Sequence, residues 1–502
     1  MSDALEKRIK KHIIGKPHRF LAVSPLGFEQ TLAEELFCIL NENRDVTNKD
    51  IEQAEMSEQK NMPCVVGDGK VEFTTKLTEA WKVVATSRIA NRVLMEVTNF
   101  KAENFRDLEK KASEIPWELY LDVRRETRDE RYNDNVVTLS ETKGPVKSCN
   151  ALNIHVTSKH SRLYHSDAIA ERLYKIIEGA KAPSQNKNRI IQQNLYVNFL
   201  DDHCTIWLDL AGEELYKRGF ERFVNDAPLK ETIASAMIFE SFHILPSTSY
   251  CLLDLMSGSG TFSLEAACIA NKIIPGICRD FALKHQPAFK EATWNFIIRR
   301  ETTDDKCVGR VSRPCLHGHD RVQHLGLERS DNPKTNGATA AITKILTSDI
   351  SERAVNIIKH NIECSPLAQI DSNEDSPTII PQLRDFFSYT AKEIANACGD
   401  SSPILVLNPP YGKRLDFDAP KLFTQIGKKL TELSRDLHNL NKSLTVAILI
   451  PKDDTRDNSK YTCTTNLLRE CPALAQKQSP DVKIIETSHG GFRLNAIIAK
   501  LG

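Results

Sequence analysis

The sequence lacks any long hydrophobic run, and it has no excess of either charge. In its 502 residues the longest apolar candidate is Leu444–Pro451, whereas a membrane helix needs roughly 18 or more apolar residues. The first residues hold no apolar signal core, so we expect a cytoplasmic protein with no membrane contact. Lys plus Arg number 67 and Asp plus Glu number 67, which excludes a histone-like polycation but leaves room for a local basic face.

The sequence also lacks the closely spaced cysteine pairs that bind structural zinc. The 13 cysteines are scattered, without a Cys-x-x-Cys pair, so we expect mostly buried free thiols and no disulfide framework. One group, formed by Cys307, Cys315, His317 and His319, invites a zinc interpretation. Its spacing matches no common structural zinc site, so we expect no bound metal.

The length allows two to four domains at roughly 100–200 residues each. Residues 1–16 predict a short basic lead-in, for which a solvated helix or frayed end and a contact with RNA are the alternatives. The following region, 17–212, predicts a mixed α+β fold with short strands, and the polar stretch 124–147 predicts a long loop. Strands are expected at 19–23, 71–73, 152–156, 196–199 and 205–210, and helices at 28–40, 77–95 and 166–178.

After about residue 230 apolar strands alternate with helices. This alternation predicts an α/β fold with a parallel, doubly wound sheet. A stretch rich in charge, Gly, Pro and Asn at about 299–337 interrupts the pattern and is expected to be an insertion. The expected strands are 251–255, 344–348, 404–407, 444–449, 483–486 and 494–499.

A glycine-rich turn follows the first of these strands, in the sequence DLMSGSGTF from Asp254. Gly258 and Gly260 let the backbone approach a ligand closely, and the helix that follows offers free N–H groups. The turn is not G-x-G-x-x-G and lacks the lysine of a P-loop, so dinucleotides and nucleoside triphosphates are disfavoured.

Two acidic residues follow the next strands. Asp349 can accept hydrogen bonds from both hydroxyls of a ribose, or it can be the N-cap of the next helix. Asp385, before Phe386, can hold an adenine amino group while the phenyl ring packs on the base, or it can be an ordinary turn residue.

The sequence Asn408-Pro409-Pro410-Tyr411 directly follows a strand. Two prolines stop the strand and stiffen the loop. The Asn408 amide oxygen and the Pro409 carbonyl are two acceptors that can grip a planar –NH2 group, while Tyr411 offers a face on which a base can stack. The pattern therefore predicts methyl transfer to an amino group.

These motifs, in this order, resemble the S-adenosylmethionine-dependent amino-group methyltransferases of the Rossmann-like class. The stretches 208–220 and 227–234 and the loop NPPYGKRL (408–415) are similar to the bacterial large-subunit ribosomal RNA guanine-N2 methyltransferases. The stretches 21–36, 71–94 and 115–121 resemble their ferredoxin-like and THUMP modules. Leu255 and Ser257 depart from the usual Pro and Cys, and a second methyltransferase half is not expected.

The resemblance implies a ferredoxin-like module at 17–70, a THUMP RNA-binding module at 71–212 and a methyltransferase domain at 213–502. It implies transfer of a methyl group from S-adenosylmethionine to guanosine N2, in 23S ribosomal RNA, with the base stacked on Tyr411. The implied catalytic residues are Asn408, Pro409, Pro410 and Tyr411. The implied cofactor-binding residues are Asp254, Gly258, Ser259, Gly260, Thr261, Asp349, Asp385 and Phe386.

Several alternatives stay open. Adenine N6 and a protein glutamine amide also present planar –NH2 groups, and a transfer RNA guanosine competes with ribosomal RNA. A non-catalytic ribosome-assembly factor with a vestigial methyltransferase domain is a further alternative. Basic residues of the N-terminal half are candidates for contacts with RNA phosphates, namely Arg88, Arg92, Lys159 and Arg162. Lys413 and Arg414, beside the catalytic loop, can also contact phosphate or can be solvated surface residues.

Overall fold

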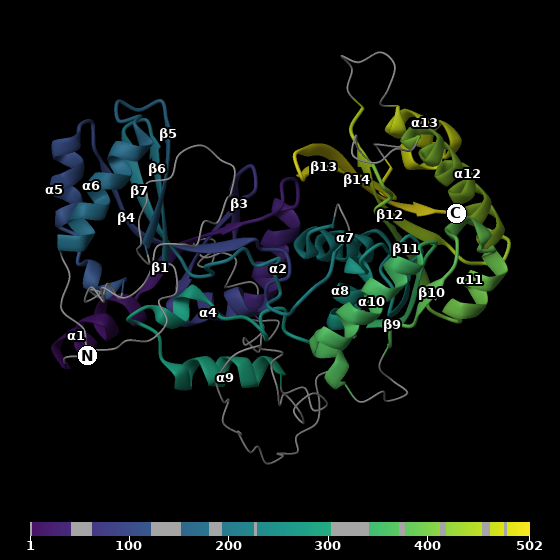
Figure 1. Ribbon diagram of the computed structural model, residues 1–502, viewed down its shortest axis with the longest axis horizontal. Helices are drawn as coiled ribbons and strands as arrows, with labels where there is room; N and C mark the ends of the chain where they lie inside the picture. The colour runs from purple at the N-terminus through teal and green to yellow at the C-terminus, as the bar shows by residue number, and fades with distance from the viewer. Residues whose placement is uncertain are drawn as a thin grey trace, which may run out of the picture.

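The computed structural model describes residues 3–41, 63–121, 152–179, 193–224, 228–302, 341–370, 377–411, 418–453, 462–475 and 479–502. The predicted loop 124–147, Lys413, Arg414 and the Cys307–His319 group lie outside these residues, as does the predicted insertion beyond residue 302. Figure 1 shows two halves side by side, each built on one sheet. No helix in the described ranges has the length and apolar character to span a bilayer.

The N-terminal half is a seven-stranded sheet in the order β2-β3-β1-β4-β7-β6-β5. All neighbouring strands are antiparallel except β5 and β6. The predicted boundary between residues 70 and 71 falls inside β3, directly after its first residue, so one sheet runs through both predicted modules. Its strands are β1 (Pro17–Val23), β2 (Cys64–Gly67), β3 (Lys70–Lys76), β4 (Arg92–Lys101), β5 (Leu152–Lys159), β6 (Gln193–Leu200) and β7 (His203–Asp209).

The prediction of one helix over 77–95 is wrong. Helix α4 (Leu77–Thr86) ends at Ser87, and the chain then enters strand β4. The apolar residues Ile89 and Val93 fit a helical period, but both are fully buried beyond the end of the helix. The other helices of this half are α2 (Glu29–Asn41), α5 (Phe105–Ser113) and α6 (Ser166–Gly179).

The lead-in forms a helix, one of the predicted alternatives, but this helix is not fully solvated. Helix α1 (Asp3–Ile9) continues into a short π-helical turn (Lys10–Ile14). Ile9 and Ile13 are 2% and 1% exposed, because their spacing of four residues puts both on the inner face of the helix. Lys10 and Lys11, which lie between them, are exposed. The basic composition of the segment therefore gave no indication that two isoleucines attach it to the core.

The C-terminal half is a second seven-stranded sheet, in the order β10-β9-β8-β11-β12-β14-β13. The first five strands are parallel and doubly wound, as predicted, but β14 lies antiparallel to β12 and β13. The two-residue turn Gly490–Gly491 allows only an antiparallel return. The strands are β8 (Ser249–Asp254), β9 (Ala341–Asp349), β10 (Pro381–Leu383), β11 (Ser402–Leu407), β12 (Leu444–Pro451), β13 (Val482–His489) and β14 (Phe492–Leu501).

Helices cover both faces of this sheet, so its central strands are buried throughout (Figure 1). Helices α7 and α8 pack on one face, and α11, α12 and α13 pack on the other. The helices of this half are α7 (Glu231–Ile244), α8 (Thr261–Ala270), α9 (Glu291–Thr302), α10 (Glu352–Cys364), α11 (Ala391–Cys398), α12 (Ala419–His438) and α13 (Cys463–Glu470).

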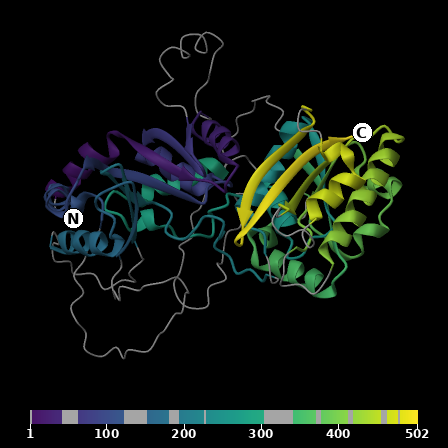
Figure 2. The same ribbon diagram turned by 90° about the horizontal axis from the view of Figure 1, so that it is seen from above.

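The two halves share one hydrophobic cluster. Thr31 Oγ1 donates to Glu240 Oε1 across 2.5 Å, and α9 packs against α4 of the N-terminal half. A Cβ atom on Gly27 would lie 2.2 Å from the Glu486 carbonyl oxygen, so the loop before α2 touches the backbone of β13. Figure 2 shows the β13–β14 hairpin reaching toward the N-terminal half. The halves therefore pack as a continuous body.

Candidate active site

The carboxyl ends of three neighbouring strands meet at one edge of the second sheet. Asp254 of β8 pairs with Thr347 of β9 and with Val406 of β11. Asp349 and Asn408, two residues beyond these partners, therefore stand at the same level on either side of the turn that follows β8. The strand order reverses between β8 and β11, and in such sheets ligands bind in the crevice at this reversal.

The glycine-rich turn lies directly over this edge. The Gly258 N–H donates to Asp349 Oδ2 across 2.8 Å, and the Ser257 hydroxyl donates to the Ser348 carbonyl across 2.9 Å. Gly258 has a φ of +56°, and a Cβ atom there would meet nothing within 4 Å. Gly260, with a φ of +77°, precedes the first turn of α8. The backbone at Gly258 therefore borders open space that a ligand can fill.

Asp254 lies beneath the turn and is 1% exposed. Its Oδ2 accepts hydrogen bonds from the Ser263 N–H at 3.1 Å and the Ser263 hydroxyl at 2.7 Å. Burial raises the pKa of Asp254 to about 7, and the nearby Asp349 carboxylate adds to the rise. Asp254 therefore holds the first turn of α8 from below and supports the glycine-rich turn.

Ser259 and Thr261 point inward, and both are buried. Arg222 Nη2 donates to Thr261 Oγ1 across 2.5 Å, and its Nη1 pairs with Glu231. Burial lowers the pKa of Arg222 to about 10. Asn361 of α10 donates to the Ser259 carbonyl across 3.1 Å. Sequence reasoning missed Arg222 and Asn361, since nothing in the local pattern connects them to a turn 30 or more residues away.

Asp349 is not the N-cap of α10. Ser351 is the cap, and its hydroxyl accepts from the Ala354 N–H at 3.4 Å. The two Asp349 oxygens accept from Gly258 and, at 2.9 Å, from the Ser351 N–H. Each carboxylate oxygen can accept a further hydrogen bond, and the side chain is half-buried at the strand end. The carboxylate is thus positioned by backbone groups and can still receive a ligand.

Asp385 and Phe386 follow the short strand β10. Asp385 caps a 3-10 turn, where Oδ1 accepts from the Phe387 N–H at 3.0 Å. Phe386 is 2% exposed and packs in the core, so the expected packing of its ring on adenine is wrong. Ile350 and Leu383, which sequence reasoning missed, are 72% and 59% exposed at the same edge. Their exposure could not be read from residue type alone.

The Asn408–Tyr411 loop leaves the end of β11. Asn408 Oδ1 is buried and has no hydrogen-bond donor among the described residues. Pro409 is buried and Pro410 is exposed. The Tyr411 ring touches both hydrophobic clusters and lies 6.0 Å from Phe492 at an interplanar angle of 79°. Burial raises the pKa of the Tyr411 hydroxyl to about 12. An orphaned buried acceptor beside a fixed aromatic ring suits an amine on a planar base.

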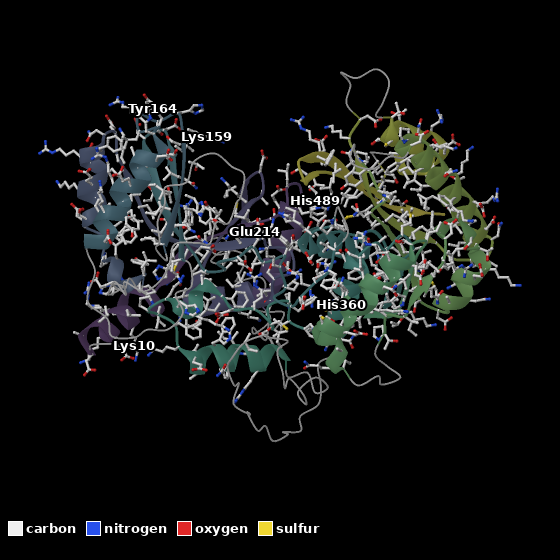
Figure 3. All side chains as sticks on the ribbon, in the orientation of Figure 1. Lys10, Lys159, Tyr164, Glu214, His360 and His489 are labelled. Atoms are coloured by element: carbon white, nitrogen blue, oxygen red, sulfur yellow. The ribbon has the colours of Figure 1, made fainter. Side chains whose placement is uncertain are left out.

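The residues predicted to contact RNA phosphates divide into two groups. For Arg88 and Arg92 the prediction is wrong, because both side chains face carboxylates inside the protein: Arg88 is 8% exposed near Glu265, and Arg92 pairs with Asp209 at 2.7 Å. Lys159 and Arg162 are exposed, and Arg162 pairs with Glu103. Figure 3 shows Lys159 near Tyr164 at the end of the N-terminal sheet farther from α1.

Within the described ranges one group of side chains has the composition of a metal site. Glu221, His360 and Cys364 bring their ligand atoms within 4.8 Å of one another. The His360 Nε2 and Cys364 Sγ atoms are 3.5 Å apart, which also suits a thiol–imidazole hydrogen bond, and Glu221 is exposed. Six of the ten described cysteines are buried, as expected.

Comparison with known proteins gives the same fold. Residues 218–449 match the sequence profile of the RMKL-like methyltransferase domain. A possible methylase from Clostridium difficile 630 superposes with a TM-score of 0.60 at 18% identity, covering 97% of this chain and 98% of that one. At this identity the likeness establishes the α/β fold with its N-terminal α+β half.

Two curated relatives are each named ribosomal RNA large subunit methyltransferase K/L. The protein of Psychromonas ingrahamii is 27% identical over 364 residues, which is 72% of this chain and 40% of the relative. The protein of Alteromonas mediterranea is 26% identical over 412 residues, which is 79% of this chain and 48% of the relative. The chain thus spans less than half the length of these relatives.

Proposed function

We propose that this chain is an RNA methyltransferase that transfers a methyl group from S-adenosylmethionine to the exocyclic N2 of a guanosine in 23S ribosomal RNA. The observation that carries the proposal is the orphaned Asn408 Oδ1, which stands at the same sheet edge as the Gly258–Asp349 contact. The names of the two relatives support a large-subunit RNA substrate.

The residues at this edge suit an adenosyl ligand. The space beside Gly258 admits a ligand against the backbone, and Asp349 offers carboxylate oxygens to a ribose. Ile350 and Leu383 offer exposed apolar surface for the adenine ring, near the Asp385 carboxylate. When bound, S-adenosylmethionine supplies an electrophilic methyl group on a sulfonium.

The catalytic loop holds the acceptor amine. Asn408 Oδ1 and the Pro409 carbonyl accept hydrogen bonds from the two amine hydrogens, and Tyr411 stacks on the base. This grip favours a pyramidal nitrogen whose lone pair points at the methyl carbon. S-adenosylmethionine, held beside Gly258 and Asp349, would give up its methyl group to this lone pair, and the proton that the methylated nitrogen loses would pass to water. Positioning and electrostatics supply the catalysis, so no strong base is needed.

The N-terminal half is assigned to RNA binding, through THUMP-type contacts to phosphates. Figure 3 shows Lys159 and Tyr164 at the top of the N-terminal half and His489 lower down, where the catalytic half faces the N-terminal half. An RNA that runs from Lys159 toward His489 would touch both halves. The charge-neutral chain then needs only a local basic surface for binding.

The test uses RNA from a strain that lacks this gene. The purified chain is supplied with S-adenosylmethionine carrying a deuterated methyl group, and large-subunit, small-subunit and transfer RNA are digested separately for nucleoside mass spectrometry. Deuterated N2-methylguanosine in large-subunit RNA is expected. Label in transfer RNA or on adenine N6 would show that the substrate differs from the proposed one, and the absence of label with intact RNA binding would favour an assembly factor.

A further inference from the structure

A small cavity lies at the tip of the β13–β14 hairpin. Its volume is about 290 Å³, and it is lined by Lys230 and residues 488–493. This volume lies at the small end of the range for ligand pockets, which are about 300–1,000 Å³. A Cβ atom on Gly490 or Gly491 would meet nothing within 4 Å, so the turn leaves one wall open.

The cavity borders the catalytic loop. Phe492 lines the cavity and meets the Tyr411 ring edge-to-face at 6.0 Å. Phe492 is 37% exposed, so its ring is accessible from the cavity side. A base stacked on Tyr411 would therefore lie near Phe492, which pairs with His489 across the hairpin turn. Figure 3 shows His489 on the side of the catalytic half that faces the N-terminal sheet.

The tautomer of His489 is fixed by a backbone carbonyl. Its Nε2 lies 2.7 Å from the Pro228 carbonyl oxygen. A carbonyl only accepts, so Nε2 carries the hydrogen and Nδ1 of the neutral ring carries a lone pair. Nδ1 is buried and has no donor among the described residues. A neutral ring is favoured, because burial lowers the pKa of His489.

We propose that this cavity receives the flipped guanine and that His489 Nδ1 accepts a hydrogen bond from its N1–H. The inference rests on the proposed guanine-N2 activity and names the residue that selects the base. In guanine the N1–H adjoins the N2 amine, so one base edge offers donors to His489 and Asn408 together. Adenine carries a lone pair at N1, which would face the lone pair of Nδ1.

An exposed cation at the cavity and an ion pair that anchors the hairpin also favour nucleotide binding. Arg493 lines the cavity and is exposed, and no ion pair joins it to a carboxylate of the described residues, so its guanidinium is available for a phosphate next to the flipped nucleotide. The hairpin is tied to the rest of the protein by Lys483, which pairs with the buried Glu240 at 2.7 Å. The acceptor on His489 is thus presented from a supported strand end.

The test uses two substitutions that each keep one side of the imidazole. His489→Gln keeps an amide N–H near the Nε2 position and loses the Nδ1 acceptor, whereas His489→Asn keeps an oxygen near Nδ1. In methyl transfer to large-subunit RNA from the deletion strain, His489→Gln should lower kcat/KM by about 10- to 100-fold, the usual effect of an unmet buried hydrogen bond. His489→Asn should lower kcat/KM by a smaller factor. His438→Gln, an exposed position on α12, is the control and should keep the wild-type rate.

A binding measurement separates base selection from support of the hairpin. Calorimetry on the full chain saturated with S-adenosylhomocysteine compares guanosine 5′-monophosphate with 2-aminopurine riboside 5′-monophosphate, which keeps the N2 amine but lacks the N1–H. The wild-type chain should prefer the guanine nucleotide, and His489→Gln should lose this preference while its melting temperature and cofactor affinity stay unchanged.

Three results would overturn the inference: equal rates for His489→Gln and the wild type, equal losses in the Gln and Asn variants, or a wild-type chain that does not discriminate between the two nucleotides. A wild-type chain that labels no guanine N2 in any RNA would instead contradict the proposed function itself.

Discussion

The backbone N–H of Gly258 donates to the carboxylate of Asp349 across 2.8 Å. This contact joins the turn after β8 to the end of β9, two segments about 90 residues apart. It means that Asp349 both shapes the glycine-rich turn and presents its remaining lone pairs at the sheet edge.

Asp349→Ala should therefore weaken cofactor binding. Loss of hydrogen bonds to a charged carboxylate costs about 2–4 kcal/mol in affinity, and the turn at Gly258 also loses its anchor. Calorimetry with S-adenosylhomocysteine measures the effect. Ser351→Ala is the matched control: it removes the cap of α10 and should lower stability by about 0.5–2 kcal/mol with affinity retained. Equal affinities in the wild type and Asp349→Ala would contradict the ribose assignment.

A buried ion-pair network should make Glu265 a stability determinant. Arg218 donates twice to Glu265, at 3.0 Å each, and Arg88 of the N-terminal half lies 3.5 Å from it. Burial alone would raise the pKa of Glu265, but Arg218 and Arg88 outweigh burial and lower it.

Glu265→Ala leaves two buried cations without their carboxylate, which should cost about 3–5 kcal/mol. Thermal unfolding followed by circular dichroism provides the measurement. Glu171→Ala, which breaks an exposed pair with Lys175 on α6, should leave the melting temperature nearly unchanged. Comparable melting temperatures for both variants would show that the network is not a stabilising link between the halves.

Asp254 should give stability a distinct pH dependence. Its folded-state pKa of about 7 exceeds the unfolded value of 3.8, so the folded chain binds the extra proton between these pH values. Unfolding then releases a proton, and the contribution of Asp254 to stability falls as pH rises from about 4 to 7. An asparagine at position 254 does not titrate, so Asp254→Asn does not lose stability in this way. The melting temperature of Asp254→Asn should therefore rise relative to that of the wild type as the pH increases from 5 to 8. Parallel melting curves across that range would disprove the assignment.

RNA affinity should depend on Lys159, an exposed residue at the end of β5. Lys159→Glu in the full chain should weaken binding to large-subunit RNA and lower the slope of log affinity against log salt by about one. Filter binding at several salt concentrations is the measurement. Lys175→Glu on α6 controls for the change in net charge, since Lys175 already pairs with Glu171. The same loss in both variants would argue against a local contact at Lys159.

The sequence was a good guide to the second sheet. Apolar runs such as 404–407 form buried strands as predicted, and the structure places the predicted site residues Gly258, Asp349 and Asn408 around the carboxyl ends of three neighbouring strands. The Gly490–Gly491 turn is visible in the sequence and implies the antiparallel return of β14, which the prediction of a parallel sheet overlooked. Local patterns could not show the end of α4 at Ser87, because the apolar spacing continues toward a strand.

Long-range contacts explain the remaining differences. Arg88 was expected at the surface because arginine usually lies there, but Glu265, 177 residues later, makes its burial tolerable. Phe386 differs from its prediction for a similar reason: the fold buries its phenyl ring in the core, whereas Ile350 is 72% exposed at the strand edge. Such choices depend on tertiary packing and not on residue type.

Asn408 is central to the proposed methyl transfer, because its side-chain oxygen is buried without a hydrogen-bond donor among the described residues. Single-turnover methyl transfer to guanine N2 in large-subunit RNA, with saturating enzyme, compares Asn408→Ala with the wild type after calorimetry has established equal cofactor affinity. Loss of one preorganised acceptor should slow the transfer by about 10²–10³-fold. An Asn408→Ala chain that binds cofactor normally and transfers the methyl group at the wild-type rate would contradict the proposed mechanism.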